Sequence, residues 1–563
     1  MSARNKSFII DIPSVDKEYA FAHQPKSKKN AFRQSLEEVY SEFCSNTTIH
    51  GFQYFGQHRP WKEVIFWIAM FVASIFFCTY IIVQLYGKWC ETPVIVSLSE
   101  KSTPIWNIPF PAVTICPETK RSINQTVPSY LQLVNSLRVY LQQGKKFHSN
   151  FTTTDLKDAL TLMQLCDVAT DAGLPSFQHD ALDYIEILNK MLPDFNRYCY
   201  SGIWFGVEKS CDKMFSRTYT EEGVCFTFNG LKEKDLYREN TMQYQRSLNS
   251  TLHERVQMFE NHSLSWSLEE GYKVQGVLHT YPARVLGSGS MAGFMPTLQG
   301  FAEDIDYSCR YVAAGFKILL HSPDDVPTMS KHFLHISMNK DIMIAVKPKM
   351  ITTSAGIAEY TPHKRQCYLT KDRQLKFFKI YSQTNCAYEC LTNFTYHLCG
   401  CVTFAMPRSP ETPVCGADKL SCYRKANEEL LFRQFNRGLQ AIEAVEALGD
   451  CDCLPACTSL DYETEISEGS FSLENTLKAI GDFQGLRDKY PGMVMSALWI
   501  YFKEPQFITS RRSELYGVTD LLANFGGVCG LFMGVSLLSG VEIFYHFTLR
   551  LWSNLGRNRR RGV

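Results

Sequence analysis

The sequence predicts an α+β membrane protein, in which two transmembrane helices flank one large extracellular domain rich in disulfides. Two long apolar runs lie near the ends of the chain, and each exceeds the about 20 helical residues needed to cross a bilayer. The segment between the runs holds every cysteine except Cys44, Cys78 and Cys529. So many cysteines in one segment indicate folding in an oxidising compartment.

Composition excludes several classes of protein. The chain has 563 residues, of which 45% are hydrophobic and 20% are charged, and its formal net charge is +1. Such a chain is neither disordered nor a nucleic-acid binder by charge, and it is too long for a single domain. Residues 1–60 lack an apolar core of the signal-peptide type, so we expect no secretory signal peptide.

The first transmembrane helix is expected at residues 63–88. The run from Val64 to Gly87 carries no charged residue, and Trp61 and Trp89 flank it as interfacial aromatic residues do. The polar residues before this helix, 1–62, predict a cytosolic N-terminal region that is mostly flexible.

Charge placement predicts the topology. Basic residues precede the first apolar run, and five arginines follow the second run, in a tail that covers residues 549–563. Because positive charge is retained on the cytosolic side, both termini should be cytosolic and residues 89–515 extracellular, with the protein in the plasma membrane. The extracellular segment also contains five N-glycosylation triplets, at Asn124, Asn150, Asn249, Asn261 and Asn393.

The extracellular segment mixes strand and helix signals. Runs rich in β-branched and aromatic residues predict strands at Val94–Leu98, Ala112–Cys116, Cys225–Asn229, Phe333–Met338, Ile342–Val346 and Met493–Phe502. Apolar periodicity predicts helices at Leu131–Gln142 and Glu428–Leu448.

Ten cysteines lie between Cys367 and Cys457. Cys386 and Cys390 would be about 6 Å apart along one face of a helix. Cys451 and Cys453 would be about 6.6 Å apart on one side of an extended segment. Because these two distances match, the helical pair and the extended pair could be joined by two disulfides, like two rungs of a ladder. A zinc site built from close cysteine pairs is the alternative, which an extracellular location disfavours.

The second transmembrane helix is expected at residues 516–548. Gly526, Gly530 and Gly534 recur every four residues, and Ser536 and the acidic Glu542 follow them. Two interpretations remain open. The glycines could pack this helix against another helix. Alternatively, exposed carbonyl groups, serines and a ring of carboxylates could form a pore for cations.

Four motifs, in order, resemble those of the degenerin/epithelial sodium channel family, which includes the acid-sensing channels. They are His50-Gly51, the Phe110–Cys116 segment FPAVTIC, the cysteine block at about 367–457, and Gly534-Val535-Ser536. The phrase TPIWNIPFPAVTICPE is most similar to the insect pickpocket branch of this family.

The resemblance implies a homo- or heterotrimer of related subunits in the lipid bilayer. It implies an extracellular domain with palm, finger, knuckle, β-ball and thumb, the thumb being the block at 367–457. It also implies the disulfides Cys116–Cys225, Cys199–Cys211, Cys367–Cys457, Cys386–Cys453, Cys390–Cys451, Cys399–Cys422 and Cys401–Cys415. Whether Cys166 pairs with Cys309 stays open, and Cys90 is left over.

The resemblance also implies an amiloride-sensitive, voltage-independent sodium channel subunit, opened by an extracellular ligand, by the matrix or by force. Sodium is the permeant ion, and no cofactor, metal site or enzymatic activity is expected. The implied selectivity filter is Gly534, Val535 and Ser536, and the pore-lining residues are Asp520, Ala523, Asn524, Gly530 and Glu542. Residues implied in gating are His50, Gly51 and Ala523.

Two departures bear on the stimulus. Lys364 stands where acid-sensing relatives carry a tryptophan, and Asn524 stands where they carry an aspartate, so proton gating is not implied. Two other classes share the topology: a nucleotide-gated trimer, and a two-span glycosylated receptor or lipid carrier without a pore. Neither class requires His50-Gly51 or the Gly-x-Ser motif. The common metalloprotease, hydrolase and phosphate-loop motifs are missing from the sequence, which argues against an enzyme.

Overall fold

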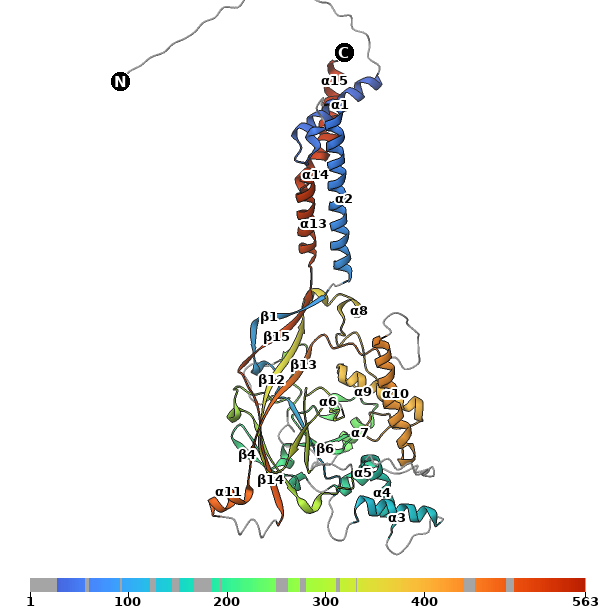
Figure 1. Cartoon of the computed structure of the whole chain (residues 1–563), viewed down its shortest axis with the longest axis vertical. Helices are drawn as coiled ribbons and strands as arrows, with labels where there is room; N and C mark the ends of the chain where they lie inside the picture. Colours follow the sequence, from blue (N-terminus) through green and yellow to red (C-terminus); the bar gives the residue numbers. More distant parts are fainter. Residues whose placement is uncertain are drawn as a thin grey trace, which may run out of the picture. The chain divides into compact units, whose positions relative to one another are not determined.

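The computed structural model describes the chain in two compact units (Figure 1). One unit combines Met1–Pro93 with Leu515–Val563, and the other is Val94–Glu514. The described residues are 28–55, 60–91, 94–121, 128–143, 151–166, 184–192, 195–249, 262–273, 280–309, 314–330, 332–439, 451–481 and 491–561. The predicted glycosylation sites Asn124, Asn150 and Asn261, and the side chain of Asn249, lie outside them. Asn393 is half-buried in a helix.

The first unit is helical. Its elements are α1 (Lys28–Asn46), η1 (Phe52–Tyr54), α2 (Trp61–Glu91), α13 (Val518–Met533), α14 (Leu537–Phe544), the π-helical turn η11 (Tyr545–Arg550) and α15 (Leu551–Arg561). Within the described part of the chain, α2 is long and apolar enough to cross a membrane by itself. Helix α13 reaches that length only together with the helix that follows it, across a bend of 65°. The second span, expected as one helix over 516–548, is therefore interrupted.

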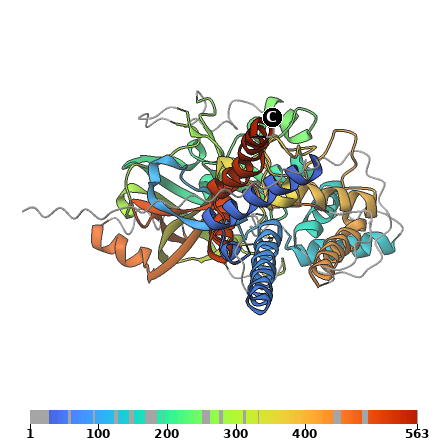
Figure 2. The same ribbon diagram turned by 90° about the horizontal axis from the view of Figure 1, so that it is seen from above.

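The N-terminal region also differs from the expectation of a mostly flexible segment, because it contains the 19-residue helix α1. Val39 and Phe43 are buried, and the Phe43 ring packs edge-on against His546 at 5.7 Å. Glu42 accepts two hydrogen bonds from the Arg550 guanidinium, the shorter of 2.8 Å. These contacts place α1 beside η11, and α1 also packs against the C-terminal helix α15 (Figure 2). The apolar residues at helical spacing were the signal in the sequence for this helix.

The second unit contains two main sheets. The larger sheet has the strand order β1-β15-β12-β14-β9-β3-β4, with β13 paired to β12, and the smaller has the order β11-β10-β2-β6-β5. The strands are β1 (Val94–Pro104), β2 (Ala112–Pro117), β3 (Cys199–Trp204), β4 (Val207–Lys209), β5 (Ser216–Thr220), β6 (Gly223–Phe228), β9 (Phe294–Phe301), β10 (Gly315–His321), β11 (Leu334–Ser337), β12 (Lys340–Thr353), β13 (Ser459–Ser470), β14 (Met493–Phe502) and β15 (Gln506–Glu514). Each strand predicted from the sequence is present. The pairings β12–β14 and β12–β15 are parallel, and the other pairings in these sheets are antiparallel.

Helices of the second unit are α3 (Tyr130–Gln142), α4 (Thr153–Cys166), α5 (Tyr184–Met191), α6 (Glu233–Leu236), α7 (Met242–Asn249), α8 (Pro362–Arg365), α9 (Gln383–Cys399), α10 (Leu420–Leu439) and α11 (Leu473–Ile480). The helix predicted at Leu131–Gln142 is α3. Helix α10 begins eight residues before the predicted start at Glu428, and residues 440–448 of that prediction lie outside the described part.

The FPAVTIC motif has a structural role in this unit. Strand β2, which carries most of the motif, lies between β10 and β6, and each of its residues is buried. Phe110, just before the strand, is fully buried with its ring 5.6 Å from that of Phe502. The motif is thus an interior strand of the small sheet together with an aromatic anchor to the large one.

Disulfides join Cys116–Cys225, Cys166–Cys309, Cys199–Cys211, Cys367–Cys457, Cys386–Cys453, Cys390–Cys451, Cys399–Cys422 and Cys401–Cys415. These are the seven pairs that the resemblance implies, with Cys166–Cys309 in addition. In the block at 367–457, helix α9 supplies Cys386 and Cys390, and their Cα atoms lie 5.7 and 5.8 Å from those of their partners. The ten cysteines of the block are all paired, as expected for disulfides and not for zinc ligands.

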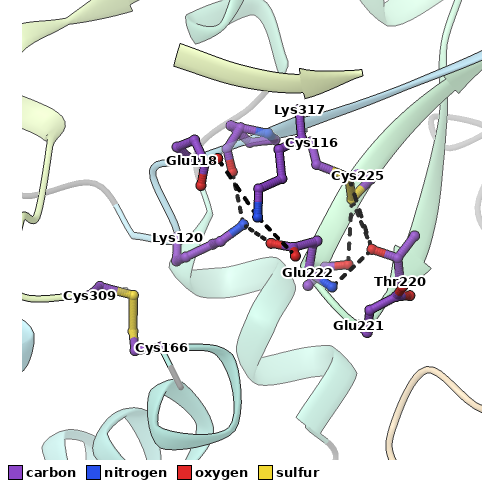
Figure 3. Close-up of polar contacts among 12 residues, drawn as sticks. Cys116, Glu118, Lys120, Cys166, Thr220, Glu221, Glu222, Cys225, Cys309 and Lys317 are labelled. Atoms are coloured by element: carbon purple, nitrogen blue, oxygen red, sulfur yellow. Dashed lines mark hydrogen bonds and ion pairs between the residues drawn. A yellow bond between two sulfur atoms is a disulfide. The ribbon is translucent and has the colours of Figure 1, made fainter. Parts of the chain in front are cut away.

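A buried cluster of opposite charges lies beside a disulfide of strand β2 (Figure 3). Lys120 and Lys317 both contact Glu222, with nitrogen–oxygen distances of 3.2 and 3.1 Å, and Lys317 lies 3.8 Å from Glu118. These four side chains are at most 11% exposed. Charges that water cannot reach need partners in the protein, and here two lysines balance two glutamates.

We expect Lys317→Met to destabilise the second unit strongly. The substitution keeps most of the side-chain volume but leaves Glu118 and Glu222 with one lysine, and breaking a buried ion pair typically costs about 3–5 kcal/mol. Melting temperatures of the purified variants measure the effect. Lys503→Met is the matched control, because Lys503 pairs with Glu465 on the exposed surface, where such pairs contribute little. Equal melting temperatures for the two variants would contradict this account.

Candidate functional site

The candidate site is the interruption between α13 and α14, where the predicted filter residues lie. Helix α13 ends at Met533, and Gly534 adopts a left-handed conformation with φ of 65°. Ser536 then caps α14, its hydroxyl accepting the backbone N–H of Ser539 at 3.3 Å. A left-handed glycine ends helices and a serine starts them, so the Gly-x-Ser sequence itself encodes the break.

Residues 47–51, between α1 and η1, lie against this break. The backbone N–H of His50 donates to the carbonyl oxygen of Met533 at 2.9 Å. In an unbroken helix that carbonyl would accept from residue 537, which here begins α14 instead. His50 therefore supplies a donor that the break removed. A Cβ atom on Gly534 would lie only 2.7 Å from the His50 ring, so the approach requires glycine there.

Two threonines extend this contact along α14. The hydroxyl of Thr48 lies 3.0 Å from that of Ser539, which is 1% exposed. The hydroxyl of Thr47 donates to the carboxylate of Glu542 at 3.4 Å. The structure thus brings Glu542, predicted to line the pore, to the same segment as the predicted gating residue His50.

The other predicted gating residue, Gly51, lies on the same turn. It has φ of +87°, a conformation that glycine adopts far more easily than other residues. Beside it, Ile49 is buried in a small apolar cluster with Phe43, and Val535 and Phe71 pack against that cluster. Segment 47–51 is therefore held by polar contacts to both α13 and α14 and by apolar contacts to its surroundings.

Most of the remaining predicted pore residues are exposed positions of α13. The half-buried residues of this helix are Leu521, Phe525, Val528, Cys529, Gly530, Phe532 and Met533, and the Phe532 carbonyl contacts α2. In contrast, Ala523 and Asn524 are exposed, and Asp520 is exposed while its carboxylate caps the N–H of Gly517. A Cβ atom built on Gly526 or Gly530 would meet no described atom within 4 Å. These glycines thus do not mediate the packing of α13 on α2.

Thr47, Thr48 and Ser539 were not among the site residues expected from the sequence. The only local signal is the repeat Ser536-x-x-Ser539, which is the spacing of a helix cap and its partner. The threonines carry no local signal, because their partners lie 491 and 495 residues away in the sequence.

A broken apolar helix, with backbone carbonyls and hydroxyls gathered at the break, is the kind of site found in channels and transporters. Residues 43–546 match the family model described as amiloride-sensitive sodium channel. The chain therefore belongs to this family. Its members are ion channels of membranes, built from several related subunits, so the chain is a sodium channel subunit and not an enzyme.

Several individual proteins are similar over most of their length. Pickpocket protein 28 of Drosophila melanogaster is 26% identical over 92% of this chain and 79% of its own length. The sodium channel protein Nach of the same species is 23% identical, over 94% of this chain and 90% of its own length. Acid-sensing ion channel 1A of Danio rerio is 21% identical, over 89% of this chain and 86% of its own length.

We expect Gly51→Ser to reduce ionic current without reducing surface protein. A residue with a Cβ atom in a left-handed conformation is strained by about 1–2 kcal/mol, so the turn that carries His50 to Met533 would shift. Current normalised to surface-biotinylated protein measures the effect. Gly87→Ser is the control, because Gly87 lies within α2 and has open space around it. Wild-type current per surface subunit in Gly51→Ser would contradict the role given to this turn.

Proposed function

We propose that the chain is a subunit of a sodium-selective, amiloride-sensitive and voltage-independent channel in the plasma membrane. Helix α2 forms the first span, and α13 with α14 forms the second, interrupted span. Both termini are cytosolic, and Val94–Glu514 is extracellular. Gly534, Val535 and Ser536 form the selectivity filter, and sodium passes without any cofactor.

The observation that carries this proposal is the break at Gly534, together with its contacts to His50. Backbone polar groups are tolerated within a membrane only where protein or water satisfies them. A glycine and a capping serine that interrupt a span expose backbone carbonyls and a hydroxyl, and such groups coordinate ions in the selectivity filters of channels. No helix with regularly spaced arginines is seen in the described residues, which supports the absence of voltage sensing.

The free face of α13 supports an assembly in which several copies of this helix surround the pore. Ala523 and Asn524 are exposed, and a Cβ atom added to Gly530 would meet no described atom within 4 Å. We therefore place this face toward the axis of a homo- or heterotrimer, with Glu542 forming a carboxylate ring on the cytosolic side of the filter. A receptor or lipid carrier without a pore would have no use for the interruption, and it remains the second candidate.

The stimulus is proposed to be an extracellular ligand, a matrix component or force. Lys364 of α8 stands where acid-sensing relatives carry a tryptophan, and its ammonium group lies 4.5 Å from the centre of the Tyr360 ring. The half-buried His321 at the end of β10 does not act as an acid sensor near neutral pH. Burial lowers its pKa to about 4, so the imidazole stays uncharged at physiological pH.

We expect Ala523→Phe to produce standing current without any stimulus. If three copies of Ala523 crowd near the axis in the closed state, a larger side chain overpacks that state at a typical cost of about 1–3 kcal/mol. A bias of about 1.4 kcal/mol changes the closed-to-open ratio tenfold. Currents in oocytes, with and without amiloride, test the prediction, and Leu522→Phe on the adjacent exposed position is the control.

Two outcomes would speak against the proposal. Standing current that amiloride does not reduce would remove amiloride sensitivity from the proposed function. No current from Ala523→Phe at wild-type surface levels would favour a protein without a pore, or an Ala523 that faces away from the axis.

A further inference from the structure

The carbonyl of Phe532 is the second backbone group that the helix break deprives of its donor. In a continuous helix it would accept the N–H of Ser536. That N–H is instead directed to the hydroxyl of Ser539, at 3.1 Å, as part of the cap of α14. Within an apolar medium a carbonyl without a donor costs several kcal/mol, so another segment has to supply one.

Ser74 of α2 supplies it. The Ser74 hydroxyl donates to the carbonyl oxygen of Phe532 at 2.6 Å. This is a short hydrogen bond between a side chain of one apolar helix and the backbone of the other. Ser74 is half-buried, and it lies near the middle of the uncharged run of α2. A serine hydroxyl at that depth must have a partner, and no water need be invoked here.

A second contact joins α2 to the start of the second span. The Trp89 indole N–H donates to the carbonyl of Tyr516, two residues before α13, at 3.2 Å. The two helices therefore run antiparallel, side by side, with Ser74 at the level of the helix break. The Ser74 hydrogen bond reaches the terminal turn of α13, just before Gly534.

We propose that Ser74 is a positioning residue for the selectivity filter. By holding the Phe532 carbonyl it fixes the last turn of α13, and hence the direction in which Gly534, Val535 and Ser536 leave that helix. Met533 is held in the same way by His50, so α2 and segment 47–51 clamp adjacent carbonyls. The inference rests on the proposed function and extends it, because it makes the first span a determinant of ion selectivity.

The test uses three variants at position 74, in the full-length chain, two of which form a matched pair. The side chains in Ser74→Thr and Ser74→Val have nearly the same shape, and only threonine has a hydroxyl. Ser74→Ala removes the hydroxyl of the native serine with little change in volume. Reversal potentials in sodium and potassium solutions give the permeability ratio, either in the wild type or on the Ala523→Phe background if a standing current is needed. Surface biotinylation gives the amount of protein.

We expect Ser74→Ala and Ser74→Val to lower the sodium-to-potassium permeability ratio about threefold, the size expected if one hydrogen bond within the membrane is lost. Ser74→Thr should keep the wild-type ratio. Thr79→Val, which removes a hydroxyl from an exposed position of the same helix, should also keep it. A simple structural role would reduce surface protein without changing this ratio.

Three results would overturn the inference. The first is a wild-type ratio in Ser74→Ala and Ser74→Val. The second is a ratio in Ser74→Thr as low as that in Ser74→Val, which would assign the effect to volume. The third is surface expression of Ser74→Thr but not of the other two, which would assign the hydroxyl to folding. Wild-type current with an unchanged ratio overturns this inference alone, whereas a chain without any current overturns the proposed function with it.

Discussion

A helix that is broken within an apolar stretch leaves backbone carbonyls and N–H groups without their helical partners, and each must find another partner. This requirement organises the helical unit. The left-handed Gly534 and the capping Ser536 create the break, and the displaced carbonyls of Phe532 and Met533 accept from Ser74 and His50. Three segments far apart in the sequence thus meet at one turn of backbone.

The same requirement explains why small and hydroxylated residues gather at this place. Glycine is needed at 534 both for its positive φ and because the His50 ring and the Thr48 carbonyl lie where a Cβ atom would be. Ser539 is buried because it serves the cap of α14 and also contacts Thr48. A hydrogen bond of this kind contributes about 0.6–2 kcal/mol in a membrane, so the arrangement is held by several modest contacts and can rearrange.

The large unit is held differently. Eight disulfides, an aromatic core and a balanced group of buried charges constrain it. Much of this could be predicted from the sequence. Strand-forming residues are recognised within a short segment, and the spacing of two cysteines gives the distance between them along a helix or a strand. The two rungs on α9 follow from such spacing, and five further pairings needed the family resemblance, while Cys166–Cys309 was left open by both. In the helical unit, the apolar run at 516–548 predicted one continuous span. Apolar content alone does not reveal that a glycine within the run adopts a left-handed conformation and ends the helix. Ser74 and Thr48 could not be predicted, because their partners are 458 and 491 residues distant.

The central claim is that ions pass the chain at the break between α13 and α14. The permeability ratio of Ser536→Cys, obtained from reversal potentials in sodium and in potassium, tests it most directly. Replacing the hydroxyl that caps α14 with a larger and weaker hydrogen-bonding thiol should widen the break, so that potassium permeates appreciably. Unchanged preference for sodium in this variant, at wild-type surface levels, would place the filter elsewhere and contradict the account.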